Sequence, residues 1–241
     1  MTWEYGDMPM TIHAGPHRFT TAEPGRITHH SFSFGPHYDP ANLGFGPMIC
    51  HNDDRVDPGG GYPDHPHADL EIVTWVLEGV LLHTDDHGNT EALRPGDVQV
   101  MSAGSGVRHS EIADAASGPT RFLQTWIAPD EPGTTPTWHT EHVEPGPGLT
   151  AVVGEGGLSI GTRGASLRIA RLTAGTTVDL PPAGRQHLFV AVGAGRIHDE
   201  VLGAGDAVRL TDQPGGAFEA TADTELLAWS FPERSKESFR R

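Results

Sequence analysis

The chain has 241 residues, 36% of them hydrophobic, and a formal charge of −16 from 16 lysines and arginines against 32 aspartates and glutamates. This length suits one large all-β unit or two domains of about 100–150 residues each. The acidic balance and the lack of long apolar runs exclude a membrane-spanning protein and argue against direct nucleic-acid binding.

The chain ends and the single cysteine add little chemistry. Residues 1–7 (MTWEYGD) lack the basic and apolar regions of a signal peptide, so we expect a cytoplasmic protein. The basic run 234–241 is interrupted by a glutamate and is typical of a solvated tail. Cys50 is the only cysteine, which rules out an intramolecular disulfide, and we expect it to be a small buried hydrophobe.

Short apolar stretches between glycines and prolines run through the whole chain. The sequence holds 31 glycines and 20 prolines, a pattern that indicates an all-β protein with many turns. Convincing amphipathic helix patterns are absent before the last few residues. In chain order we expect strands over 27–34, 71–77, 80–83, 98–101, 107–112 and 121–127, with turns at 35–46, 78–79, 85–89, 94–97 and 103–106.

The two halves of the chain resemble each other. Residues 76–81 (VLEGVL) parallel 192–197 (VGAGRI), and 93–98 (LRPGDV) parallel 202–207 (LGAGDA) in the same order. This order predicts a duplicated β-barrel. Four prolines and three glycines crowd the segment between the halves. We therefore expect a first barrel over residues 1–130, a linker over 131–148 and a second barrel over 149–241.

Two short motifs carry the chemistry of the first half. In His65-Pro66-His67, both histidines project to one face of an extended segment, which the proline favours. His109-Ser110-Glu111 repeats this spacing. If the two segments are neighbours facing one barrel interior, three imidazoles and a carboxylate converge. That donor set suits a first-row divalent metal.

Neither motif is strong alone, because the chain contains 15 histidines. The two motifs have the same spacing, and each lies beside turn residues in a strand-rich half. Together they favour a metal site over coincidence. The carboxylate is ambiguous on residue spacing, since Glu71 has the same strand parity as His65 and His67 and could also point inward.

The motifs and their surroundings resemble the pirin family of the cupin superfamily. The resemblance rests on GYPDHPHADLE (61–71), RPGDVQVMSAGSGVRHSE (94–111), SFSF (31–34), YDP (38–40) and NDD (52–54), and it is dense over about residues 27–130. It implies a bicupin, an all-β chain of two barrels. It also implies one metal, usually iron, held by His65, His67, His109 and Glu111, with Glu111 in place of Glu71.

The second half offers no matching ligands under the registers that the repeat suggests. Aligning Gly195 with Gly79, and Gly205 with Gly96, places four residues opposite the ligand positions: Pro181, Ala183, Phe218 and Ala220. His187 falls opposite Glu71, and we interpret it as structural. We expect the second barrel to support the first and to bind no metal.

The resemblance also implies an activity. Similar bacterial proteins are associated with quercetin 2,3-dioxygenase activity, which opens the central ring of a flavonol with O₂ and releases CO. On this reading Glu111 is catalytic as the proton acceptor, the metal is Fe(II), and no organic cofactor is needed. Zn, Ni, Co, Cu or Mn would suit the same ligands.

Two other functions stay open at this point. The protein could be a metal-binding regulator or redox sensor that acts through a protein partner, or a dioxygenase for another enol or catechol. The sequence alone does not choose the metal, the substrate or the oligomeric state.

Overall fold

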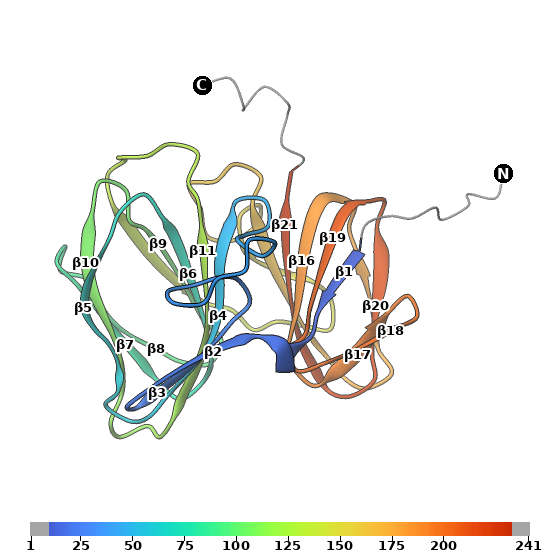
Figure 1. The fold of residues 1–241 in the computed structure, drawn as a ribbon, viewed down its shortest axis with the longest axis horizontal. Helices are drawn as coiled ribbons and strands as arrows, with labels where there is room; N and C mark the ends of the chain where they lie inside the picture. Colours follow the sequence, from blue (N-terminus) through green and yellow to red (C-terminus); the bar gives the residue numbers. More distant parts are fainter. Residues whose placement is uncertain (1–9, 233–241) are drawn as a thin grey trace. The chain divides into compact units, whose positions relative to one another are not determined.

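The computed structural model describes residues 10–232 (Figure 1), so the predicted basic tail and the first nine residues lie outside it. The expected all-β class is confirmed, and within residues 10–232 the helical structure is one 3-10 turn, η1 (Gly15–His17). No helix in this range is long and apolar enough to span a membrane. The described residues form two compact units, one of residues 18–144 and 156–163 and the other of 10–17, 145–155 and 164–232.

The first unit consists of two antiparallel sheets. The larger has the order β12-β9-β6-β11-β4-β3-β2, and the smaller has the order β5-β10-β7-β8. Their bounds are β2 (Phe19–Glu23), β3 (Arg26–His30), β4 (Met48–Val56), β5 (Gly61–His67), β6 (Glu71–Glu78), β7 (Leu81–Asp85), β8 (Thr90–Leu93), β9 (Asp97–Ser102), β10 (Val107–Ala113), β11 (Thr120–Ile127) and β12 (Thr137–His142).

The core of the first unit lies between these sheets. Val76 and Phe122 from the larger sheet pack in one cluster with Leu81, Leu93 and Ala113 from the smaller sheet. Since side chains alternate along a strand, each inner face presents every second residue to this core. The expected strands at 71–77, 80–83, 98–101, 107–112 and 121–127 correspond to β6, β7, β9, β10 and β11.

Several parts of the first unit differ from the sequence expectation, among them β2 and β12, which were not predicted. The strand expected over 27–34 ends at His30, and Phe34 forms only an isolated bridge with His37. Residues 48–56 form β4, a long strand of the larger sheet that the sequence analysis missed. Cys50 lies on β4 and is buried as expected, and burial raises the pKa of its thiol well above the ordinary value.

The second unit repeats the two-sheet design. Its sheets have the orders β1-β19-β16-β21-β14-β13 and β15-β20-β17-β18. The bounds are β1 (Met10–His13), β13 (Thr150–Val153), β14 (Ser166–Leu172), β15 (Thr177–Leu180), β16 (Ala183–Val192), β17 (Ala194–Ile197), β18 (Glu200–Gly203), β19 (Ala207–Gln213), β20 (Gly216–Ala220) and β21 (Thr224–Phe231). Leu188, Phe218 and Leu226 belong to one core cluster that both sheets supply.

Two strands bear on the expected domain limits. β1, near the start of the chain, pairs with β19 in the second unit. β12, inside the expected linker 131–148, pairs with β9 in the first unit. The division into 1–130, 131–148 and 149–241 stays a prediction.

Hydrogen bonds identify which residues of the two units correspond. Thr120 Oγ1 accepts from Val80 N and donates to Val80 O, and Thr224 Oγ1 makes the same pair of bonds with Ala194. Gly79 therefore corresponds to Gly193, two residues before the Gly195 that the sequence repeat suggested. The register suggested by the sequence is therefore wrong. In Gly193-Ala194-Gly195 either glycine can be aligned with Gly79 on sequence alone, and the wrong one was chosen.

The ligand motif of the first unit has apolar counterparts in the second. Ala113 and Ala220 make equivalent backbone bonds, to Gly59 and Gly60 in one unit and to residues 175 and 176 in the other. Counting back along each strand aligns Glu111 with Phe218 and His109 with Gly216.

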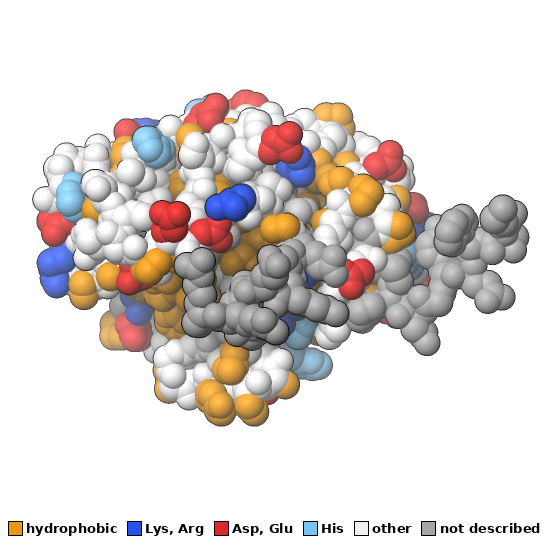
Figure 2. Space-filling model, turned by 90° about the horizontal axis from the view of Figure 1, so that it is seen from above, with side chains coloured by type: hydrophobic (Ala, Val, Ile, Leu, Met, Phe, Trp, Pro, Cys, Tyr) orange, Lys and Arg blue, Asp and Glu red, His pale blue; other side chains and the backbone are white. Residues whose placement is uncertain are grey.

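Figure 2 shows a face on which acidic and basic side chains are interspersed, without a continuous basic stripe among the coloured residues.

Candidate metal centre

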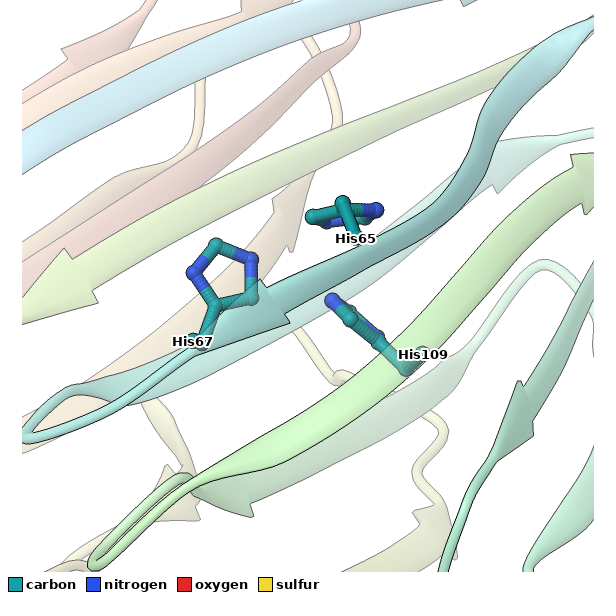
Figure 3. A group of neighbouring side chains, drawn as sticks. All are labelled: His65, His67 and His109. Carbon is teal, nitrogen blue, oxygen red and sulfur yellow. The ribbon is translucent and has the colours of Figure 1, made fainter.

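Three of the predicted ligands meet inside the first unit. His65 and His67 lie on β5, and His109 lies opposite His65 on the neighbouring strand β10. The ring centroids are 4.4 Å apart for His65–His109, 4.8 Å for His65–His67 and 5.1 Å for His67–His109. One possible ligand atom from each histidine lies within 4.8 Å of the others. Figure 3 shows the three rings turned toward one another.

The local fold of β5 and β10 explains this convergence. Val107, His109, Glu111 and Ala113 occupy the buried positions of β10, which alternate with more exposed ones. Between the pairs His109–His65 and Glu111–Tyr62, β5 advances three residues while β10 advances two. This bulge re-aims the side chains of β5.

Gly61 allows β5 to lie this close to β10. Its φ is +138°, and a Cβ there would lie 2.1 Å from the carbonyl oxygen of Glu111. A residue with a side chain at this position would push β5 away from β10, and with it the two histidines of the H-P-H motif.

The fourth predicted ligand, Glu111, lies deeper in the unit. Its side chain is buried, and Gln124 Nε2 donates to both carboxylate oxygens at 2.8 Å. Gln124 Oε1 in turn accepts from Trp126 Nε1 at 2.9 Å. Burial raises the pKa of Glu111 to about 7, against the lowering effect of the Gln124 hydrogen bond.

Glu111 belongs to a second group of potential ligands, which also contains His109 and His83. His83 lies on β7 directly opposite Glu111, and it is fully buried. Its Nδ1 lies 3.5 Å from His109 Nδ1. His83 was not predicted as a ligand because it stands outside any paired motif. The inward parity that it shares with Leu81 and Asp85 in β7 was the available signal.

The competing carboxylate is occupied elsewhere. Glu71 Oε2 accepts from Ser102 Oγ at 2.6 Å and from Gly161 N at 3.0 Å. Glu71 belongs to neither of the two ligand groups found among residues 10–232. Its hydrogen bonds explain how a buried carboxylate is accommodated at this position.

Two of the imidazoles, His67 and His109, are in the neutral state that a metal requires. Burial and the neighbouring His65 lower the pKa of His67 to about 4, and burial with the surrounding histidines lowers that of His109 to about 2. Neutral rings leave one lone pair each for coordination. His65 Nδ1 lies 2.8 Å from the Pro63 carbonyl, which can only accept, so its Nε2 carries the lone pair.

One atom points to a missing partner. His109 Nε2 is buried and has no hydrogen-bond partner in the described part of the chain. A buried polar nitrogen without a partner is costly, and it needs a ligand or a bound ion to offset that cost. The donor set of imidazole nitrogens with a nearby carboxylate fits a divalent transition metal.

Aromatic side chains lie beside the cluster. The Trp126 ring meets His67 edge-on, with centroids 4.9 Å apart, and Phe34 meets Trp126 at 5.2 Å. His30 stacks on Phe34 at 5.0 Å. The histidine cluster therefore has a wall of flat rings next to it, which suits contact with a planar aromatic molecule.

Two paired-sheet units in one chain, with a histidine cluster inside the first, define a bicupin with a candidate metal centre. The Pirin family model matches residues 14–127. A Mycobacterium tuberculosis protein is 42% identical over 209 residues, which cover 83% of this chain and 86% of that protein. The quercetin 2,3-dioxygenase of Escherichia coli K12 is 33% identical over 208 residues, covering 84% and 90%.

A solved structure agrees with these relatives. The bacterial pirin YhhW of Escherichia coli, crystallised in complex with nickel(II), matches with a TM-score of 0.87 and 30% identity, covering 93% of this chain and 99% of that one. The chain belongs to the pirin family. The resemblance stated from the sequence motifs is confirmed, and so is the bicupin fold class.

Proposed function

We propose that this protein is a metal-dependent dioxygenase of the pirin type, which opens the central ring of a flavonol such as quercetin with O₂ and releases CO. The observation that carries the proposal is the convergence of His65, His67 and His109. The Nε2 atom of His109 is buried without a hydrogen-bond partner among the described residues, and Glu111 lies two residues further along β10. The quercetin 2,3-dioxygenase name of the Escherichia coli relative supports the reaction class.

His65, His67, His109 and Glu111 are the residues proposed to hold the ion, and Fe(II) is our choice of metal. The nickel(II) complex of the Escherichia coli pirin supports a divalent ion at this kind of site. Three neutral imidazoles and one carboxylate leave such an ion with net positive charge, which lowers the pKa of a hydroxyl group beside it.

The protein's own side chains supply binding and proton transfer. Trp126 and Phe34 provide flat apolar surface for the flavonol rings beside the histidines. Glu111 takes the proton from the flavonol hydroxyl group, which leaves the electron-rich flavonolate to react with O₂. Gln124 holds the Glu111 carboxylate in place through both oxygens, so that the acceptor is oriented before substrate arrives.

The experiment couples metal content to turnover. Protein purified without a histidine tag is analysed for metals, loaded with Fe, Mn, Co, Ni or Cu, and mixed with quercetin anaerobically before air is admitted. We expect loss of flavonol absorbance with release of CO. His65→Ala and His109→Ala should lose both metal and turnover, while His29→Ala should keep both, because His29 is a half-buried histidine of β3 that belongs to neither ligand group of the described residues.

Two results would count against the proposal in different ways. If His65→Ala and His109→Ala retain the wild-type metal content, the metal site itself is wrong. If the protein binds metal but no loaded form consumes quercetin, the dioxygenase reaction is wrong, and the metal-binding regulator suggested by the sequence becomes the better account.

A further inference from the structure

His83 occupies a position that the proposed metal site does not explain. Its imidazole is fully buried and stacks on Trp138, with centroids 5.4 Å apart and planes 24° apart. It also neighbours the His109 ring, at 5.3 Å, and its ligand atom lies within 4.8 Å of Glu111. A histidine buried here has polar nitrogens that must find partners among very few groups.

The two nitrogens of His83 face different partners. Nε2 lies 3.5 Å from Asp85 Oδ2, and Nδ1 lies 3.5 Å from His109 Nδ1. The side chains therefore form a row, Asp85–His83–His109, that runs from the end of β7 to the candidate ligand on β10.

Asp85 is fixed by the turn that follows β7. Its Oδ1 accepts from His87 N at 3.0 Å and from Asn89 N at 2.9 Å, and its Oδ2 accepts from Asn89 Nδ2 at 2.7 Å. Although its burial acts to raise the pKa of Asp85, these bonds and His83 keep that pKa below the ordinary value. An ionised carboxylate held in this way is an acceptor only.

An acceptor at one end dictates where each proton of the row lies. His83 Nε2 has no hydrogen-bond partner within residues 10–232, but the Asp85 carboxylate 3.5 Å away attracts a proton to that nitrogen. The Nδ1 of a neutral His83 then has only a lone pair. His109 Nδ1 must then carry a proton to face it. The remaining nitrogen, His109 Nε2, is left with its lone pair, and like His83 Nε2 it is buried without a hydrogen-bond partner in the described part of the chain.

We propose that Asp85 and His83 are positioning residues that hold His109 in the Nδ1–H tautomer and so direct its Nε2 lone pair at the space between His65 and His67. The inference rests on the proposed metal site. The Pro63 carbonyl does the same for His65 through a single backbone acceptor. His109 has no carbonyl bond of this kind among its described contacts, and the row of two side chains replaces it. Ligand histidines in proteins commonly need such a partner on the second nitrogen.

The distance between the rings admits a rival explanation. Two nitrogens bound tetrahedrally to one ion at about 2.0–2.1 Å lie about 3.4 Å apart, close to the 3.5 Å between His83 and His109. His83 could in that case be a ligand itself. The experiment must therefore separate a positioning residue from a ligand.

The first measurement reads the tautomers in the metal-free, full-length, ¹⁵N-labelled wild type by long-range ¹H–¹⁵N correlation. Single variants His83→Phe and His109→Ala assign the two rings. We expect a proton on Nδ1 of His109 and on Nε2 of His83. A proton on His109 Nε2 would overturn the proposal without any variant having to fold normally.

The second measurement is Ni²⁺ affinity by calorimetry. His83→Phe keeps a ring against Trp138 but removes the acceptor, and it should weaken Ni²⁺ binding about 10–100-fold. His83→Asn places an amide oxygen near the position of Nδ1 and should restore most of the affinity. His87→Phe, on the exposed turn beyond Asp85, is the matched control and should bind as the wild type does.

Three affinity results would overturn the proposal. Unchanged affinity in His83→Phe would show that the row has no effect. Equal loss in His83→Phe and His83→Asn would indicate a packing role. Loss as complete as in His109→Ala would make His83 a ligand. A wild type that binds no Ni²⁺ would refute the metal site instead, and the tautomer spectra would still decide the protonation of the row.

Discussion

The pair formed by Glu111 and Gln124 allows the carboxylate to be moved without removing it. In the wild type, Gln124 Nε2 donates to both Glu111 oxygens, and Trp126 Nε1 donates to the Gln124 oxygen. Exchanging the two residues, Glu111→Gln with Gln124→Glu, keeps one carboxylate, one amide and the same net charge. The new amide on β10 then donates to the new carboxylate on β11, which also accepts from Trp126.

The structure sets the expected costs. Glu111→Gln alone removes a hydrogen bond to a charged group inside the unit, worth about 1.5–3 kcal/mol of unfolding free energy. Gln124→Glu alone places two carboxylates about 2.8 Å apart where both side chains are buried, and the uncompensated charge costs about 3–5 kcal/mol. Because the exchange restores the donor and acceptor pattern, the double variant should be markedly more stable than Gln124→Glu.

Stability and turnover should separate in the double variant. Urea unfolding followed by tryptophan fluorescence measures the first, and CO release from quercetin with the metal-loaded protein measures the second. We expect recovered stability without recovered ring opening, because the carboxylate no longer lies two residues from His109. Wild-type turnover in the double variant would refute the catalytic role given to Glu111.

Three further predictions concern the surroundings of the site. Burial raises the pKa of Asp54 from 3.8 to about 6, so its contribution to stability is full below pH 4 and is lost as the pH rises through 6. The difference in unfolding free energy between Asp54→Asn and the wild type should therefore shift by about 3 kcal/mol in favour of the variant from pH 4 to pH 8, as measured by urea unfolding. A difference that does not change with pH would contradict this. Arg121 bonds to the buried Asp53 carboxylate at 2.8 and 2.9 Å, and Arg18 is its second ion-pair partner at 3.4 Å. Because Arg18 remains, Arg121→Met should cost about 3 kcal/mol of unfolding free energy, the lower end of the range for breaking a buried pair, and adding Asp53→Asn should return most of it. An equal loss in that double variant would show that the Asp53 charge is not the cause. Gly61→Ala should lose about 2–3 kcal/mol more unfolding free energy than Gly106→Ala. Both glycines have a φ of +138°, but only Gly61 faces a backbone oxygen. Calorimetric melting of the two variants measures the losses, and equal losses would rule out the clash.

The ligand motifs could be predicted because their geometry is local. The alternation of side chains along an extended strand places His65 with His67, and His109 with Glu111, whatever the rest of the chain does. That the two strands are neighbours was an assumption, and the pairing of His109 with His65 confirms it. The turn before the second motif also placed the start of its strand, predicted over 107–112 and found as β10 over Val107–Ala113.

β4 was missed because its composition is unlike that of a buried strand. Asn52, Asp53 and Asp54 lie in its middle, and all three are buried. Arg121 pairs with Asp53, while Thr28 and Tyr62 donate to Asp54. Arg121 and Thr28 come from strands far away in the sequence, and Tyr62 lies on the following strand β5. No pattern within residues 48–56 therefore shows that the polar run can be buried.

The sequence by itself determined the all-β class and the two motifs that place three imidazoles and one carboxylate on strands, because strand periodicity and turn chemistry are properties of neighbouring residues. The family followed from the resemblance of these motifs and their surroundings to pirins. Only the tertiary structure decided what the other groups do. It bonds Glu71 to Ser102 and Gly161, places Gln124 on the Glu111 carboxylate, and sets Asp85 and His83 behind His109. Apart from Asp85 and His83, which share β7, these contacts join different segments of the chain. Their positions depend on how strands pair and how sheets pack, which periodicity within one strand does not encode.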